Sequence, residues 1–253
     1  MSTNDIFHDA RYSINHANRH IRSLETEIAA FFDQDPFSSL VAEPSADGSQ
    51  NVHKVKLVRP MPAVLSGIAF DAISSLRSSL DQAGYSIARA AGTSGKKAHY
   101  PFGDNAAQAT SRRWAGSKDL PQDIFDVMLS FEPYKGGNDL LWAMNKLCNS
   151  HKHEIIMPVA IWTGSATGEF RGPIGIGTFP PKWDSVKQEM VIAYSPPGSA
   201  PSIEYKIETF IAFAEFQGVT GQPAIRVLDK MLATVDGIIV ALEAESRKIG
   251  IIQ

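Results

Sequence analysis

The spacing of apolar residues changes twice along this chain of 253 residues, and this change constrains the fold more than any other feature. Up to about residue 153, apolar residues recur at intervals of three and four, which is typical of amphipathic helices. They then alternate with polar residues to about residue 221, as in half-buried strands. A helical period returns after Pro223. Helices, then strands, then one helix predict an α+β protein rather than a parallel α/β sheet.

The first half of the chain contains four predicted helices. The first carries the apolar stripe Ile14–Phe31 and ends near Asp33, because the residue before Pro36 resists helical geometry. The second spans 63–91, with Gly92 as its cap. Two shorter helices follow, one over 121–129 and one from the N-cap Asn138 to Leu147.

The segments between these helices have different compositions. Residues 36–51 are rich in Ser, Pro, Asp and Gly, so we predict a loop, followed by a short strand over 52–59. Residues 92–119 are polar and lack a period, and we predict a long loop there that is functional or mobile.

Four strands and a closing helix are predicted for the second half. The strands span 154–163, 169–178, 189–195 and 202–213, and the Gly- and Pro-rich turns between them predict an antiparallel meander. The closing helix starts at Pro223 and ends before Gly250. We therefore expect one integrated domain with three regions. These are a mainly helical bundle at 1–152, an antiparallel β region at 153–221, and a C-terminal helix at 222–253 that packs back on the bundle.

Composition excludes several broad classes of protein. The net charge of −3 gives no overall attraction to nucleic acid or an anionic membrane, although it leaves room for a local basic groove. The single cysteine, Cys148, forms no intramolecular disulfide. The N-terminus lacks the pattern of a secretory signal, and no apolar run is long enough to cross a bilayer. We expect a cytoplasmic protein without a membrane partner.

Common cofactor and metal motifs fail on inspection. The glycines at 92–95 and 172–177 have neither the spacing nor the context of phosphate-binding loops, so no cofactor is expected. His16 and His20 are four residues apart, with Glu27 seven further on, a spacing that can bind zinc. No further ligand follows at a characteristic spacing, and we predict no metal site.

Arg77 and Asp81 are the first candidate functional residues. They lie four apart on the second helix, beside its apolar stripe, so they can form an ion pair along the helix. One interpretation is a structural salt bridge at the edge of the core. The other is an arginine and a carboxylate oriented at the mouth of a polar cleft.

A dense polar cluster follows the helix that ends near Leu147. It reads Asn-Ser-His-Lys-His-Glu over 149–154. Histidine is the natural general acid or base near neutral pH, and lysine binds phosphate as a point charge. A buried, hydrogen-bonded histidine is the structural alternative for either ring.

Several of these residues fall in stretches that resemble a known family. The family consists of uncharacterised bacterial proteins, and the resemblance covers about the first 160 residues. Its patterns are A-x-x-H-I-x-x-L, G-D-x-x-x-x-L-R-S-A-L-D-H, Q-P-Y and L-x-x-L-x-N-x-D-K-H-R. The matching stretches here are Ala17–Leu24, Phe70–Gln82, Glu132–Tyr134 and Leu147–Glu154.

The resemblance adds three binding candidates, and this chain departs from the family pattern at several positions. It includes His20, Asp71 and Asn149. Phe70 stands in place of Gly and Gln82 in place of His, while residues 150–154 stand in place of Asp-Lys-His-Arg. The Lys-His pair is kept, which implies a functional role at position 153. Our candidates for catalysis are Arg77, Asp81, Lys152 and His153, and those for binding are His20, Asp71, Asn149 and His151.

More distantly, the family is similar to HEPN helical bundles, many of which are metal-independent ribonucleases of toxin or defence systems. This implies RNA cleavage, with His153 or His151 as the base and Arg77 and Lys152 stabilising the phosphate. The other interpretation is a binding or interaction module, in which the same residues form a polar network that fixes the packing. The sequence leaves open whether the chain is an enzyme, and its partner, whether RNA, a small polar ligand or a second copy in a homodimer, also stays open.

Overall fold

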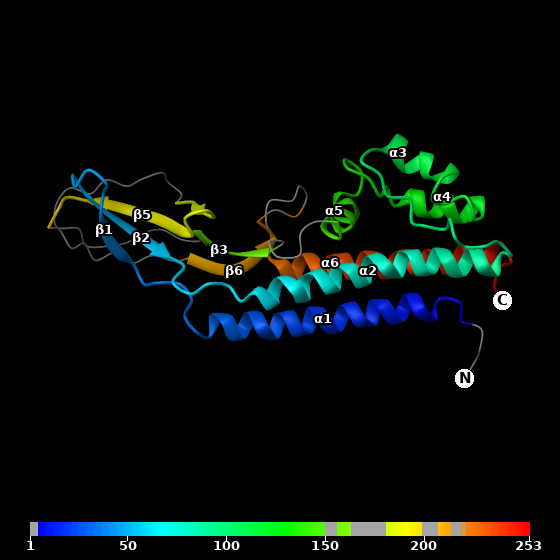
Figure 1. The fold of residues 1–253 in the computed structure, drawn as a ribbon, viewed down its shortest axis with the longest axis horizontal. Coiled ribbons are helices and arrows are strands. Elements are labelled where there is room, and N and C mark those ends of the chain that lie inside the picture. Colours follow the sequence, from blue (N-terminus) through cyan, green and yellow to red (C-terminus); the bar gives the residue numbers. More distant parts are fainter. Residues whose placement is uncertain (1–4, 150–155, 163–180, 199–206, 214–218, 220) are drawn as a thin grey trace. The chain divides into compact units, whose positions relative to one another are not determined.

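A computed structural model describes residues 5–149, 156–162, 181–198, 207–213, 219 and 221–253. The elements confirm the α+β class (Figure 1). The chain divides into two compact units. The helical unit contains residues 1–26, 63–155 and 213–253, and the β unit contains residues 27–62 and 156–212. The predicted strand at 169–178 and the residues 150–154 lie outside the described residues.

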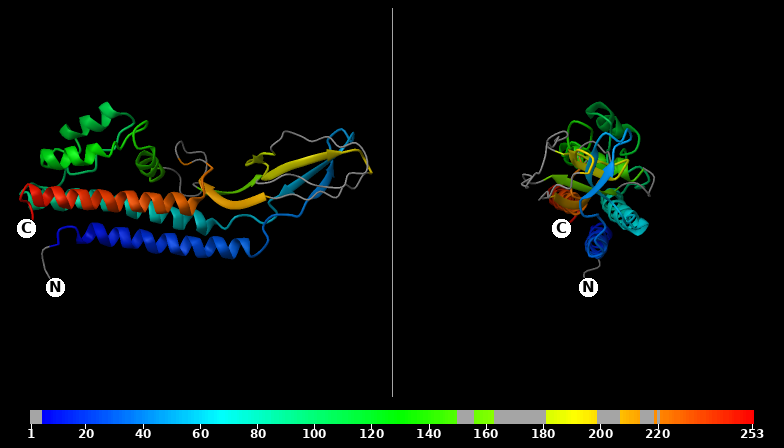
Figure 2. Two further views of the ribbon diagram at one scale, coloured as in Figure 1. Left: turned by 180° about the vertical axis from the view of Figure 1, so that it is seen from behind. Right: turned by 90° about the vertical axis from the view of Figure 1, so that its left-hand side faces the viewer.

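Three long helices run side by side in the helical unit, as both views in Figure 2 show. They are α1 (His8–Phe32), α2 (Ala63–Ala90) and α6 (Ala224–Lys248). Seven apolar residues of α2, spaced three or four apart, are fully buried, because a 3.6-residue period places them on one face. They are Leu65, Ala69, Ala72, Leu76, Leu80, Ala83 and Ile87. The closing helix α6 contacts α2 and, through an ion pair at Arg11, α1.

Shorter helices cover one side of this unit. The predicted helices at 121–129 and 138–147 are confirmed as α4 (Gln122–Ser130) and α5 (Asp139–Leu147), and the side chain of Asn138 caps α5 at the amide of Leu141, 3.1 Å away. The prediction of a loop throughout 92–119 was wrong. This segment contains α3 (Ala106–Ser111) and the 3₁₀ turn Arg112–Trp114, because Asn105 caps α3 at the amide of Gln108.

The β unit contains a four-stranded antiparallel sheet in the order β1-β2-β5-β4. Its strands are β1 (Val41–Pro44), β2 (Asn51–Lys56), β4 (Trp183–Asp184) and β5 (Glu189–Ser195). The predicted strand at 189–195 is confirmed. The predicted loop at 36–51 was wrong in part, because β1 pairs with β2 across a turn at 45–50. Asp47 accepts hydrogen bonds from Ser45 and Ser49 in that turn, and Gly48 has a φ of 70°.

A second sheet in the β unit has two strands, β3 (Ile156–Trp162) and β6 (Ile207–Phe213). They fall within the predicted strands 154–163 and 202–213. Val55, Met190 and Ile192 form the buried core of this unit. Among the described residues, no helix has both the length and the apolar character that crossing a bilayer requires.

Candidate functional site

Arg77 and Asp81 form the predicted ion pair on α2, and both side chains also contact residues outside this helix. Their side chains are 21% and 32% exposed, so the pair lies at the edge of the core. The Nε of Arg77 donates to Asn145 Oδ1 on α5 at 3.0 Å, while its Nη1 binds Asp81. The Arg77 guanidinium lies 4.5 Å from the centre of the Phe102 ring. One arginine therefore links α2, α5 and the segment that carries Phe102.

The second carboxylate oxygen of Asp81, which does not bind Arg77, contacts the same segment of chain as the Arg77 guanidinium. This oxygen, Oδ1, accepts the backbone N–H of Tyr100 at 2.9 Å, and the Nδ1 of His99 lies 3.9 Å from it. A backbone amide bound to a carboxylate is a charge-assisted hydrogen bond, which is roughly twice as strong as a neutral one. The Arg77–Asp81 pair thus fixes the path of residues 99–102 along α2.

Further contacts hold residues 100–104 against α4 and α5. The buried hydroxyl of Tyr100 donates to the carbonyl of Met128 at 3.2 Å, and burial raises the pKa of Tyr100. Asp104 accepts from the indole of Trp142 at 3.1 Å and pairs with Lys146 at 2.7 Å. Its bond to Lys146 lowers the pKa of Asp104. Three helices therefore order this segment, which we call the anchored segment (99–104).

A polar groove lies on the neighbouring face of α2, where it meets α1. It is lined by serines, histidines and amide or carboxylate groups, namely Ser13, His16, His20, Asp71, Ser74, Ser75, Ser78 and Gln82. The rings of His16 and His20 lie 4.4 Å apart, and His16 Nδ1 is 3.2 Å from the Ser75 hydroxyl. The Nε2 of His20 is enclosed and has no hydrogen-bond partner in the described part of the chain. Burial and the neighbouring His16 lower the pKa of His20, so its ring is neutral at pH 7.

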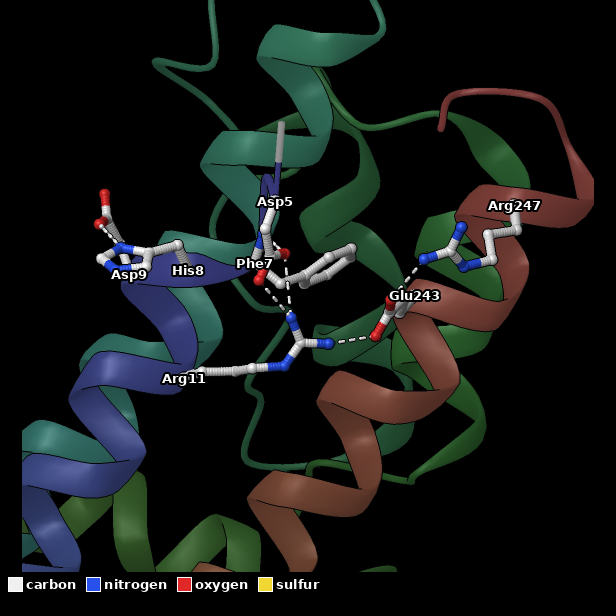
Figure 3. Close-up of polar contacts among 7 residues, drawn as sticks. All are labelled: Asp5, Phe7, His8, Asp9, Arg11, Glu243 and Arg247. Atoms are coloured by element: carbon white, nitrogen blue, oxygen red, sulfur yellow. Dashed lines mark hydrogen bonds and ion pairs between the residues drawn. The ribbon is translucent and has the colours of Figure 1, made fainter. Parts of the chain in front are cut away.

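A third polar region lies where α1 begins and α6 ends, and Figure 3 shows its charged side chains. Arg11 reaches between Asp5, 2.8 Å away, and Glu243 of α6. Arg247, one turn further along α6, binds the other oxygen of Glu243 at 2.9 Å. These charges neutralise one another within the wall of a pocket, so the arrangement joins the two helices and leaves little free charge for a ligand.

The predicted site residues occupy two places in the described structure. Arg77 and Asp81 are joined directly. Asn149 lies one contact away, because its side-chain amide donates to the carbonyl of Asn145 at 2.8 Å. His20 and Asp71 both line the α1–α2 groove, on a different face of α2.

Other predicted residues are not placed, and the chemistry of the site stays a prediction. His151, Lys152 and His153 lie outside the described residues. Burial raises the pKa of Cys148 to about 11, so this thiol is protonated at neutral pH. Within the described ranges, no three His, Cys, Asp or Glu side chains gather closely enough to hold a metal ion.

Sequence reasoning missed the partners of the Arg77–Asp81 pair. Asn145, Tyr100 and Phe102 lie 68, 23 and 25 positions from Arg77 in the chain, so no local spacing links them. The Tyr-Pro-Phe run at 100–102 was the available signal, because bulky aromatic residues inside a polar segment indicate that it packs against a core.

Comparison with known proteins gives no further assignment. The chain matches no protein-family model, no curated protein and no solved structure.

Proposed function

We propose that this protein is a binding module in which Arg77 and Asp81 position a binding surface and do no chemistry themselves. The observation that supports this most directly is that both groups are committed to the protein's own chain. Arg77 binds Asn145 and lies over Phe102, and Asp81 accepts the amide of Tyr100. A general acid or a phosphate-binding arginine needs its polar atoms directed at substrate.

The surface that this network supports is the stretch from 93 to 119. It follows α2, passes through the anchored segment, and continues into α3 and the turn at 112–114. Tyr100 and Phe102 at its middle are buried, while Trp114 beyond them is 81% exposed. A loop held on a rigid scaffold with an exposed aromatic residue is a common form of binding surface.

The competing function is the metal-independent RNA cleavage that the resemblance implies. The test is to incubate purified protein with structured and unstructured RNAs, and to measure both RNA integrity and thermal unfolding for wild type, Arg77→Met and His153→Ala. Binding without chemistry predicts intact RNA and a lower melting temperature for Arg77→Met. RNA cleavage that both variants abolish, at an unchanged melting temperature, would overturn the proposal in favour of the ribonuclease.

Arg89→Met is the matched control. Arg89 also lies on α2 and is exposed, and in the described part of the chain its side chain donates to the carbonyl of Thr93 at 3.3 Å. The Arg89→Met variant loses the same charge but leaves the contacts of Arg77 and Asp81 intact. Its melting temperature should therefore stay close to that of wild type.

A further inference from the structure

Two segments lie side by side at the outer end of the 93–119 stretch. The backbone N–H of His99 donates to Gly116 O at 3.0 Å, and that of Asp119 donates to Lys97 O at 2.9 Å. The hydroxyl of Ser117 adds a bond to His99 O at 2.7 Å. Residues 93–99 and 112–119 therefore form one continuous surface.

This surface is basic although the whole chain is not. The two segments contain five cationic residues, Lys96, Lys97, Arg112, Arg113 and Lys118, and one acidic residue, Asp119. The Asp119 carboxylate faces inward to its own loop, since it accepts from the Ser94 hydroxyl at 2.6 Å and from the Lys97 amide at 3.3 Å. The three lysines are exposed to solvent. A local positive field is thus present in a protein whose net charge is −3.

Trp114 supplies an aromatic face among these cations. Its side chain is 81% exposed, the highest value among the described aromatic residues. The Arg113 guanidinium lies 5.9 Å from its ring and is itself fixed by bonds to Gln122 Oε1 at 2.7 Å and Ser117 O at 3.1 Å. The ring is therefore attached to an ordered backbone while it remains open to solvent. Tyr85, 52% exposed, packs on Gly95 at the start of the same surface.

We infer that this basic aromatic surface, residues 93–99 and 112–119, binds single-stranded nucleic acid. Lysines and arginines around an exposed ring match a phosphate backbone whose unpaired bases stack on aromatic side chains. In a duplex, each base stacks on its neighbours, which covers the face that Trp114 would contact. A membrane surface is disfavoured because it needs several apolar side chains beside the cations, and these two segments offer Trp114 alone as a large apolar group.

This inference rests on the proposed function, because it names the partner of the surface that the Arg77–Asp81 pair supports. The two fail separately. RNA cleavage that Arg77→Met and His153→Ala both abolish, at an unchanged melting temperature, would overturn the proposed function. Absence of binding to single strands would overturn this inference alone.

The test is fluorescence anisotropy of labelled U20 RNA, dT20 DNA and a 20-base-pair RNA duplex, titrated with full-length protein over a range of salt concentrations. We expect the single strands to bind more tightly than the duplex, and the RNA and DNA arms to show whether the 2′-hydroxyl contributes. With three or four phosphates contacted, log affinity should fall against log salt with a slope of about −2 to −3.

The variants separate charge from stacking. Substituting Lys96, Lys97 and Lys118 by alanine should weaken binding at low salt by about tenfold or more and flatten the salt slope by about 2. Trp114→Ala should weaken it by about tenfold, and Trp114→Phe should restore most of that loss. The control replaces Lys182, Lys187 and Lys230, which are exposed elsewhere, and should leave affinity nearly unchanged.

Three results would overturn the inference. They are no binding of either single strand at low salt, equal binding of the duplex, and affinity that survives Trp114→Ala or the lysine substitutions. Thermal melting of every variant verifies that a loss of binding does not come from unfolding.

Discussion

At the scale of single residues, the chain uses close contacts on α2 to hold the segment that follows it. Gly84 is the clearest case. A Cβ atom at this position would lie 2.2 Å from the carbonyl oxygen of Ala98, a distance that real side chains do not reach. The glycine therefore lets the backbone of the 93–119 stretch lie directly on the helix, next to the turn where Asp81 binds Tyr100.

Gly84→Ala should destabilise the fold by about 1–3 kcal/mol, because a backbone carbonyl must move to admit the methyl group. Gly67→Ala on the same helix is the matched control, since nothing lies within 4 Å of its Cβ position. It should stabilise the protein by about 0.5–1 kcal/mol through better helix propensity. Urea unfolding of both variants measures the difference, and equal effects would show that the helix and Ala98 are not in close contact.

The lowered pKa of His20 leads to a prediction of how the stability of the protein depends on pH. Burial lowers the pKa of His20 in the folded protein below the ordinary 6.5, so the unfolded chain takes up this proton first as pH falls. The contribution of a neutral His20 to stability is therefore complete above pH 6.5 and is lost below it. The ring signals of His20 in an NMR titration should have a midpoint below 6.5. His20→Phe should reduce the loss of stability between pH 7 and pH 5, and a midpoint above 6.5 would contradict this account.

At the scale of elements, the long helices are joined by ion pairs that differ in exposure. Arg11, 38% exposed, pairs with Asp5 and with Glu243 on α6, where Arg247 also binds (Figure 3). A network of charges contributes more than an isolated exposed pair, because its members hold one another in place.

Arg11→Met should therefore speed amide hydrogen exchange in the first two turns of α1 and lower stability by about 0.5–1 kcal/mol. Arg22→Met is the control, because Arg22 also links α1 to α6, at Asp229, but is 57% exposed. We expect a smaller effect there. A larger effect for Arg22 than for Arg11 would show that the network adds nothing.

Elements with long apolar periods could be predicted from the sequence, and short ones could not. The stripes on α1, α2 and α6 repeat over many turns, and the alternation at 189–195 matches β5 closely. β1 and α3 were missed because each has only four to six residues, too few to display a period. They depend instead on a turn around Asp47 and a cap at Asn105. Such local hydrogen bonds are weak signals in a single sequence.

The candidate site was also predictable only where local spacing along the chain determines it. Arg77 and Asp81 lie four apart, so helix geometry alone joins them. Their links to Asn145, Tyr100 and Phe102 depend on how separate elements pack, which spacing along the chain does not encode. The role of the pair depends on those distant partners, so the sequence alone left both a polar cleft and a structural salt bridge open.

At the scale of the whole molecule, the net charge does not reflect the local charge of the basic aromatic surface on the helical unit. The net charge of −3 led us to expect no overall attraction to nucleic acid, and that expectation concerned the average field. Five cations and one carboxylate on two adjacent segments give that region the opposite sign. The Arg77–Asp81 pair on α2 contacts Tyr100 and Phe102, which lie in the chain between the two segments of this surface. Loss of the pair should therefore also loosen the surface.

The most direct test of this account is hydrogen–deuterium exchange of residues 97–119 in wild type and Arg77→Met. If the pair positions the binding surface, its loss should cost about 2 kcal/mol and speed exchange in this stretch by about thirtyfold, while the core of α6 stays protected. Unchanged exchange in residues 97–119 would contradict the account, because it would show that the surface is ordered without Arg77.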